Sequence, residues 1–174
     1  RALLLARFAE EGIEAGTDQL LLTASGTQAI DLICRFLLRP GDKVLIDVAN
    51  PLDLNSQPPI LTICNTDSLG ERLQREFPMA KVVKALNTCN CRVMVDPARA
   101  GADHDVFVCG NDGGAKETVK ALLRDFGWTT IIDLGDITAA RATEQLMPIW
   151  LRLYGLFGSA DFNFKLVRPG RREP

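Results

Sequence analysis

The sequence has one histidine, His104, and no Gly-x-Gly-x-x-Gly motif. Its five cysteines include one close pair, Cys89 and Cys91, whereas zinc fingers and zinc ribbons need two pairs of ligands at set spacing. The odd cysteine count and the absence of a secretory signal favour free thiols in a reducing cytoplasm. We therefore expect buried structural cysteines, no metal site and a cytoplasmic protein.

The sequence also lacks a strong charge and a long apolar run. Its 20 lysines and arginines nearly balance 22 aspartates and glutamates, so the net charge of −2 creates no field that would recruit nucleic acid or an anionic membrane. The richest apolar stretch, residues 146–157, is shorter than the roughly 18 residues of a membrane span and contains Pro148 and Arg152. We expect neither nucleic acid nor a membrane as a partner.

The length and composition are those of one ordinary globular domain. The chain has 174 residues, of which 47% are hydrophobic and 24% are charged, and this length suffices for a sizeable core. The chain begins at Arg1 rather than at a methionine, which favours a fragment of a longer protein.

Strand patterns alternate with helix patterns along the chain. Short, dense apolar runs typical of buried strands occupy residues 20–23, 43–48, 81–86, 105–109 and 129–134. Helical apolar spacing occupies residues 2–9, 25–38, 68–77, 114–126 and 137–157, the last with a kink at Pro148, and residues 50–59 form an irregular loop. This order predicts an α/β fold in a single domain, with a Rossmann-like, mostly parallel sheet flanked by helices.

Polar residues near the predicted helices indicate local contacts. Ser68 and Glu71 have the spacing of a capping box, and Asn111 or Asp112 is a helix N-cap. Arg141 and Glu144, three residues apart, predict an ion pair on a helix surface.

His104 and the aromatic residues have ordinary structural interpretations. His104 lies between polar neighbours, which predicts a solvated loop residue rather than a catalyst. The large aromatic residues are expected to fill the core: Trp128, Trp150, Phe157 and Phe162.

The turn between the first predicted strand and helix is a candidate phosphate site. Ser25, Gly26, Thr27 and Gln28 are small or polar residues at a helix N-terminus, where free backbone N–H groups favour an anion. Ser25 and Gln28 also match a plain capping box, so both interpretations stay open.

Residues 1–48, and especially LLLTASGTQAIDLICRFLLRPGDKVLID, resemble a segment of the fold-type-I pyridoxal-phosphate aminotransferases. In that family the turn matching residues 25–28 holds the cofactor phosphate. The family's Schiff-base lysine lies far downstream of this segment, and residues 49–174 do not continue the family pattern. We therefore do not expect pyridoxal phosphate as a cofactor.

A longer resemblance covers residues from about 42 to 168. DKVLIDVANPL, SLGERLQREFPMAKVVKALNT, DVFVCGNDGGAKETVKALLRDFGW, IIDLGDITAARATEQLMPIWLRL and FNFKLV resemble the NADP oxidoreductases that reduce a deazaflavin coenzyme, and their dinucleotide-binding relatives. The resemblance implies that two strand ends close on the nicotinamide, with these residues lining the site: Asn50, Pro51, Lys84, Asn87 and Thr88. Leu86 stands where the family often has Phe.

The family's Gly-rich pyrophosphate turn is missing, and the aminotransferase-like segment stands in its place. The sequence therefore has the character of a chimera, with segments 1–48 and 42–168 and a tail at 169–174. The resemblance implies an NAD(P)-dependent oxidoreductase that transfers hydride between the nicotinamide and a deazaflavin or flavin-like acceptor, and whether loss of the Gly-rich loop impairs this activity stays open. The resemblance is compatible with an oligomer and identifies no catalytic residue. Two alternatives stay open: a non-catalytic fragment or fusion scaffold, and a pyridoxal-phosphate aminotransferase fragment.

Overall fold

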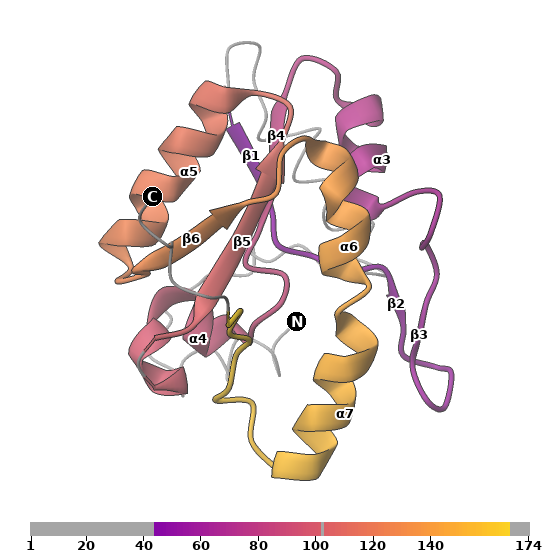
Figure 1. Cartoon of the computed structure of the whole chain (residues 1–174). Helices are drawn as coiled ribbons and strands as arrows, with labels where there is room; N and C mark the ends of the chain where they lie inside the picture. Colours follow the sequence, from indigo (N-terminus) through magenta and orange to yellow (C-terminus); the bar gives the residue numbers. More distant parts are fainter. Residues whose placement is uncertain (1–43, 102, 168–174) are drawn as a thin grey trace, which may run out of the picture. The chain divides into compact units, whose positions relative to one another are not determined.

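A computed structural model describes residues 44–101 and 103–167 of the chain, and these residues form a sheet covered by helices (Figure 1). The sheet has the order β1-β4-β5-β6. Its strands are β1 (Val44–Asp47), β4 (Lys81–Ala85), β5 (Asp105–Gly110) and β6 (Thr130–Asp133). The predictions of strands at 43–48, 81–86, 105–109 and 129–134 are confirmed, and the predicted strand at 20–23 lies outside the described residues.

The pairing of the strands is mostly parallel. β1 pairs with β4 and β5 pairs with β6 in parallel, whereas β4 and β5 are antiparallel. The predicted Rossmann-like, mostly parallel sheet is therefore confirmed, with one antiparallel pairing at its centre. At that pairing β5 ends on Gly110, where a Cβ atom would lie 2.6 Å from the carbonyl oxygen of Val82, so only glycine allows this approach.

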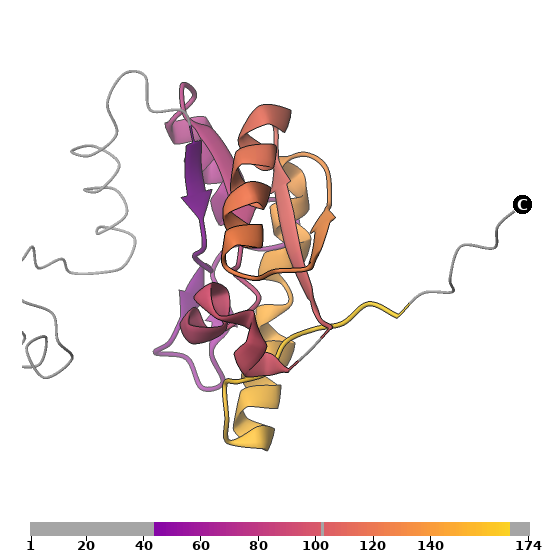
Figure 2. The same cartoon turned by 90° about the vertical axis from the view of Figure 1, so that its left-hand side faces the viewer.

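Helices cover both faces of the sheet. On one face α5 (Gly113–Asp125) and α4 (Cys91–Val95) pack on a core that includes Val83, Val106 and Val108. Figure 2 shows α5 in front of the sheet, and α6 (Ala140–Glu144) lies on the opposite face with α3 (Leu69–Glu76). Since successive side chains of a strand point to opposite faces, Lys84 faces α6 while its neighbours Val83 and Ala85 face the core.

The carboxyl-terminal helical region differs from the prediction. One helix with a kink at Pro148 was expected over residues 137–157. The structure has a 3-10 turn η2 (Ile137–Ala139), then α6, then a separate α7 (Met147–Phe157) that contains Pro148 in its first turn. The prediction of one helix is wrong because proline lacks a backbone N–H and is most easily accommodated at a helix start.

Two short segments were not predicted correctly. The expected irregular loop at 50–59 contains β2 (Leu52–Asp53), which pairs with β3 (Ile60–Leu61) in an antiparallel hairpin. α4 and the following 3-10 turn η1 (Pro97–Ala100) were missed. These elements are too short to produce a periodic pattern.

The caps of α3 and α5 follow the prediction. Asp112 accepts a hydrogen bond from the backbone N–H of Ala115 (2.7 Å), and Ser68 accepts one from the backbone N–H of Glu71 (3.1 Å). The capping box at α3 is modified, since the Ser68 hydroxyl itself donates to the Glu71 carboxylate (2.8 Å). That arrangement leaves Glu71 able to bind a second helix.

His104 is buried, so its interpretation as a solvated residue is wrong. Its ring packs edge-on against the buried Trp128 at a centroid distance of 5.0 Å. Its two nitrogens bond to the Pro97 carbonyl and to the Asn163 side chain, each at 2.9 Å. Because both ring nitrogens have partners, burial is tolerated.

The other aromatic residues are less buried than expected. Trp150 is half-buried, stacked between Tyr154 and Phe162, and Phe157 is exposed, which corrects its assignment to the core. Within residues 44–101 and 103–167, no helix is both long and apolar enough to cross a membrane.

Candidate functional site

The carboxyl ends of β1 and β4 meet at one edge of the sheet, where two asparagines bond to each other. The Asn50 amide nitrogen donates to the Asn87 carbonyl oxygen (2.7 Å), and the Asn87 amide nitrogen donates to the Asn50 side-chain oxygen (2.9 Å). Parallel strands bring their carboxyl ends to the same edge, which is why residues 37 positions apart meet here. The resemblance predicted that these two residues share a site, and the structure brings them together.

The turn after β4 has an unusual backbone. Leu86 adopts a φ of 63°, the left-handed region that costs a non-glycine residue about 1–3 kcal/mol. The Cys89 backbone N–H donates to the Leu86 carbonyl (3.3 Å) and closes the turn around Asn87 and Thr88, both of which are buried. Backbone strain of this kind gathers at functional sites, so this turn is a second indication of function.

Pro51 connects the edge to the β2–β3 hairpin. It is buried, and its carbonyl accepts hydrogen bonds from the Thr62 backbone N–H (2.8 Å) and the Thr62 hydroxyl (3.0 Å). These bonds to Thr62 fix the backbone of the segment that follows Asn50.

Lys84 has a different environment from the cleft position that the resemblance implied. Its side chain is 0% exposed, and its ammonium donates to Asp47 (2.8 Å), Glu144 (2.7 Å) and the Ala49 carbonyl (2.6 Å). All three hydrogens of the ammonium thus have an oxygen partner. Lys84 is therefore buried and bonded to Ala49, the residue that precedes Asn50.

Glu144 and Arg141 do not form the predicted surface ion pair, and that prediction is wrong. Glu144 is buried and accepts from the backbone N–H groups of Leu69 (3.0 Å) and Gly70 (3.2 Å) in addition to Lys84. Arg141 donates instead to the Glu71 carboxylate (2.7 and 2.5 Å). Arg141 lowers the pKa of Glu71, and Glu71 in turn raises the pKa of Arg141.

Sequence reasoning missed Asp47 and Glu144 as members of this region. One signal was present in the sequence: Lys84 occupies an otherwise apolar strand, Val-Val-Lys-Ala. A buried ammonium needs paired carboxylates, so this lysine predicts acidic partners without identifying them. Ser25, Gly26, Thr27 and Gln28, the candidate phosphate residues, lie outside the described residues.

Several solved structures and curated proteins are similar to this chain. A structure from Arthrobacter sp. FB24, provisionally named an F420-dependent NADP reductase, is 58% identical, has a TM-score of 0.70, and matches over 72% of this chain and 57% of its own. Residues 42–168 resemble the deazaflavin-dependent NADP oxidoreductases. The F420-dependent NADP reductase of Methanocaldococcus jannaschii is 27% identical over 113 residues, 64% of this chain and 50% of its own length.

Two further proteins are also similar to this chain. Metalloreductase STEAP3 of Rattus norvegicus is 28% identical over 158 residues, 86% of this chain and 30% of the relative. A hypothetical protein, SMa0349, from Sinorhizobium meliloti is 23% identical with a TM-score of 0.54, over 80% of this chain and 71% of its own, and shares the fold. No family model matches the chain. The chain spans half or less of the length of the two curated relatives.

The resemblance of residues 1–48 to aminotransferases gains no support, because none of these relatives is an aminotransferase. The match to the metalloreductase covers 86% of this chain, more than the residues from 42 to the end contain, so it includes part of the preceding segment. The chimera interpretation therefore has no support from these relatives either.

Proposed function

We propose that this chain is part of an NADP-dependent oxidoreductase and binds the nicotinamide end of NADP(H) at the carboxyl ends of β1 and β4. The observation that carries the proposal is the Asn50–Asn87 pair at this edge, in a chain that is 58% identical to a provisionally named F420-dependent NADP reductase. Open α/β sheets bind ligands outside the carboxyl ends of their strands, which is where this pair lies.

The residues of the edge bind and orient the ligand. Asn50 and Asn87 hold each other in one geometry, Pro51 limits the backbone beside them, and Thr88 continues the strained turn. NADPH supplies a hydride from its nicotinamide ring when bound, and such a transfer depends chiefly on placing donor and acceptor in contact. This chemistry requires no acid–base residue at the edge.

The names of two relatives indicate the class of molecule that accepts or donates the hydride. Two of them are named F420-dependent NADP reductases, so we propose a deazaflavin or a similar flavin as the small molecule that exchanges hydride with NADP(H). A cytoplasmic location agrees with the cysteine usage of the sequence.

The proposal is tested by an NADPH titration of the whole chain, followed through the backbone amide NMR signals. We expect the signals of Asn50, Asn87 and Thr88 to move, and Asn87→Ala to weaken binding by about tenfold because one polar contact of roughly 1.4 kcal/mol is lost. Asn55→Ala is the matched control, since Asn55 is an exposed residue of the β2–β3 hairpin. Signals that do not move at saturating NADPH would contradict the proposal and favour a non-catalytic scaffold.

A further inference from the structure

Three charged side chains form a buried cluster that the proposed hydride chemistry does not use. Lys84 on β4 lies between Asp47 at the end of β1 and Glu144 at the end of α6, and the three side chains are at most 1% exposed. The cluster contains one more carboxylate than ammonium. Burying such a set is costly unless its geometry is complete, and its complete replacement by apolar residues can even stabilise a protein. Stability alone is therefore a weak reason for the cluster.

The cluster holds the backbone that leads into the Asn50–Asn87 pair. Asp47 accepts from the backbone N–H of Ala49 (3.0 Å), and Lys84 donates to the carbonyl of the same residue (2.6 Å). Both backbone groups of Ala49 are thus bonded to the cluster, and Asn50 is the next residue. The direction in which Asn50 leaves β1 depends on these two bonds.

Glu144 links this turn to two helices. From its position on α6, Glu144 accepts hydrogen bonds from the first two backbone N–H groups of α3 and also from the Lys84 ammonium. The close approach depends on Gly70, where a Cβ atom would lie 3.0 Å from the Cβ of Ala140 and 3.5 Å from a carboxylate oxygen of Asp47. This close packing of α3 against α6 therefore fixes the position of the Glu144 carboxylate.

We propose that Lys84, Asp47 and Glu144 are positioning residues that hold the Ala49–Asn50 turn, and with it the Asn50–Asn87 pair, in the geometry that receives the nicotinamide end of the ligand. This inference rests on the proposed function. A turn ordered in advance does not have to be ordered when the ligand binds, so the cluster raises affinity without touching the ligand. Lys84 then holds the backbone of the site in place and does not contact the ligand.

The decisive variant is Glu144→Gln, which keeps the size of the side chain and leaves Lys84 paired with Asp47. Its matched control is Glu71→Gln, because Glu71 also joins α3 to α6, through Ser68 and Arg141. Asp47→Asn is a second variant in case Glu144→Gln does not fold. It leaves one ammonium with one carboxylate and retains an oxygen that can accept from Ala49.

Two measurements distinguish positioning from a structural role. Hydrogen exchange of the Ala49 amide reports the turn without any ligand, and we expect it to be about tenfold faster in Glu144→Gln than in Glu71→Gln. Titration of both variants with NADPH reports the site. We expect NADPH binding to weaken about tenfold in Glu144→Gln and to be unchanged in Glu71→Gln.

The outcomes separate this inference from the proposed function. Equal acceleration of Ala49 exchange in Glu144→Gln and Glu71→Gln, or equal weakening of NADPH binding in the two variants, would overturn the positioning role. If the wild-type chain does not bind NADPH, the proposed function fails, and the positioning role for a nicotinamide fails with it. Ala49 exchange would then show only whether the cluster holds the turn.

Discussion

At the scale of single residues, charged side chains of this protein have partners from distant parts of the chain. Lys84 bonds to a carboxylate 37 positions earlier and to one 60 positions later. Arg141 bonds to Glu71, 70 positions earlier, rather than to its helical neighbour. Local spacing could not predict these pairs, because each depends on which faces of the helices and strands pack together.

Asp133 illustrates how such partners set the pH dependence of stability. Its carboxylate accepts from Lys116 (2.9 Å) and Lys120 (2.8 Å). Burial alone would raise the pKa of Asp133, but the two lysines outweigh burial and lower the pKa to about 2. A lowered pKa in the folded state contributes stability above the unfolded value of 3.8, and this contribution is lost as the pH falls towards 2.

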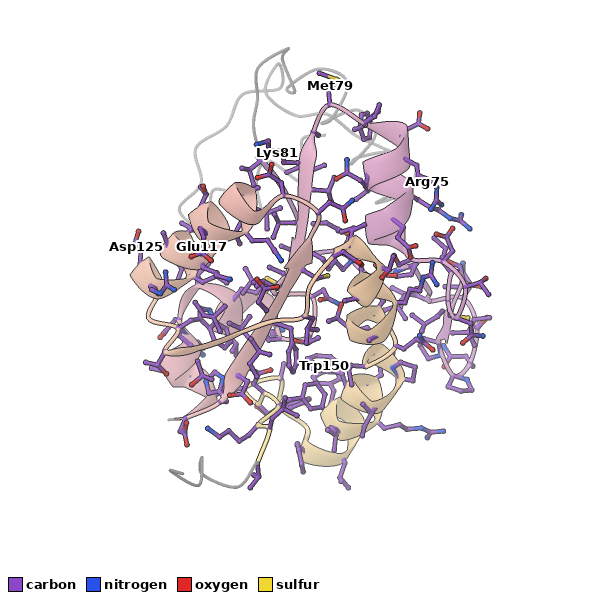
Figure 3. The ribbon with its side chains drawn as sticks, turned by 45° about the horizontal axis from the view of Figure 1, so that its top comes forward. Arg75, Met79, Lys81, Glu117, Asp125 and Trp150 are labelled. Atoms are coloured by element: carbon purple, nitrogen blue, oxygen red, sulfur yellow. The ribbon has the colours of Figure 1, made fainter. Side chains whose placement is uncertain are left out.

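We therefore predict that Asp133→Asn lowers the free energy of unfolding by about 1 kcal/mol at neutral pH, a value reduced for the solvent that reaches this pair. The difference from the wild type should vanish near pH 2, as measured by urea unfolding across the acid range. Asp125→Asn is the control, since Asp125 lies at the outer end of α5 (Figure 3). A pH-independent loss in Asp133→Asn would contradict the electrostatic account.

The cysteines within residues 44–101 and 103–167 form two classes that differ in reactivity. Cys89 and Cys109 are buried, and burial raises the pKa of each thiol to about 12, whereas Cys64 and Cys91 are exposed. Because the thiolate is the reactive form, Ellman's reagent should modify Cys64 and Cys91 of the folded protein first. We expect Cys89 and Cys109 to react at least tenfold more slowly until urea unfolds the chain, as peptide mass spectrometry can show. Equal native rates at Cys64 and Cys109 would refute the prediction.

At the scale of elements, the helices on the face of α6 meet at closer range than their sequences suggest. α3 approaches α6 and η2 at Gly70, where a Cβ atom would lie 3.0 Å from Ala140 and 3.2 Å from the side chain of Ile137. Both neighbours belong to the packed interior and have little room to move. Glycine is a weak helix former, but at position 70 the absence of a side chain permits α3 to contact α6 and η2.

We predict that Gly70→Ala destabilises the protein by about 1–3 kcal/mol, the usual cost of overpacking a tight contact. Gly155→Ala is the matched control in α7, because nothing lies within 4 Å of the position of its Cβ atom. Alanine is the better helix former by roughly 0.5–1 kcal/mol, so Gly155→Ala should be neutral or stabilising. Urea unfolding of both variants measures the difference, and an unchanged midpoint for Gly70→Ala would contradict the steric account.

At the scale of the whole molecule, the described strands form a sheet whose site edge lies at the carboxyl ends of β1 and β4. The strand ends that we propose as walls of a dinucleotide site lie at this edge, but the chain contains no Gly-x-Gly-x-x-Gly turn to receive a pyrophosphate. The chain also spans only 57% of the Arthrobacter protein.

We predict that the chain by itself binds NADPH weakly. Each charge-assisted hydrogen bond that a Gly-rich turn would supply is worth about 1.5–3 kcal/mol, so two missing bonds weaken binding by roughly 100-fold or more. A micromolar site would thus become nearly millimolar, which calorimetric titration can measure. A low-micromolar affinity would contradict the prediction and point to another turn of the chain, such as residues 25–28, as the pyrophosphate site.

The sequence by itself determined the features that depend on local pattern. Dense apolar runs specified the four described strands of the sheet, and helical spacing and caps specified α3 and α5. Each of these follows from periodicity or capping within a few residues. The meeting of Asn50 and Asn87 was implied by the family resemblance, and it depends on the parallel pairing of β1 with β4.

Only the tertiary structure decided how the elements combine. It paired β4 with β5 antiparallel, separated α6 from α7, and brought Glu144 to Lys84. The physical reason is that periodicity shows which face of an element is apolar, whereas the partner of a buried charge is decided by the packing of faces far apart in the chain. For that reason the ionic cluster could not be predicted from the sequence, whereas the asparagine pair was implied by the family resemblance.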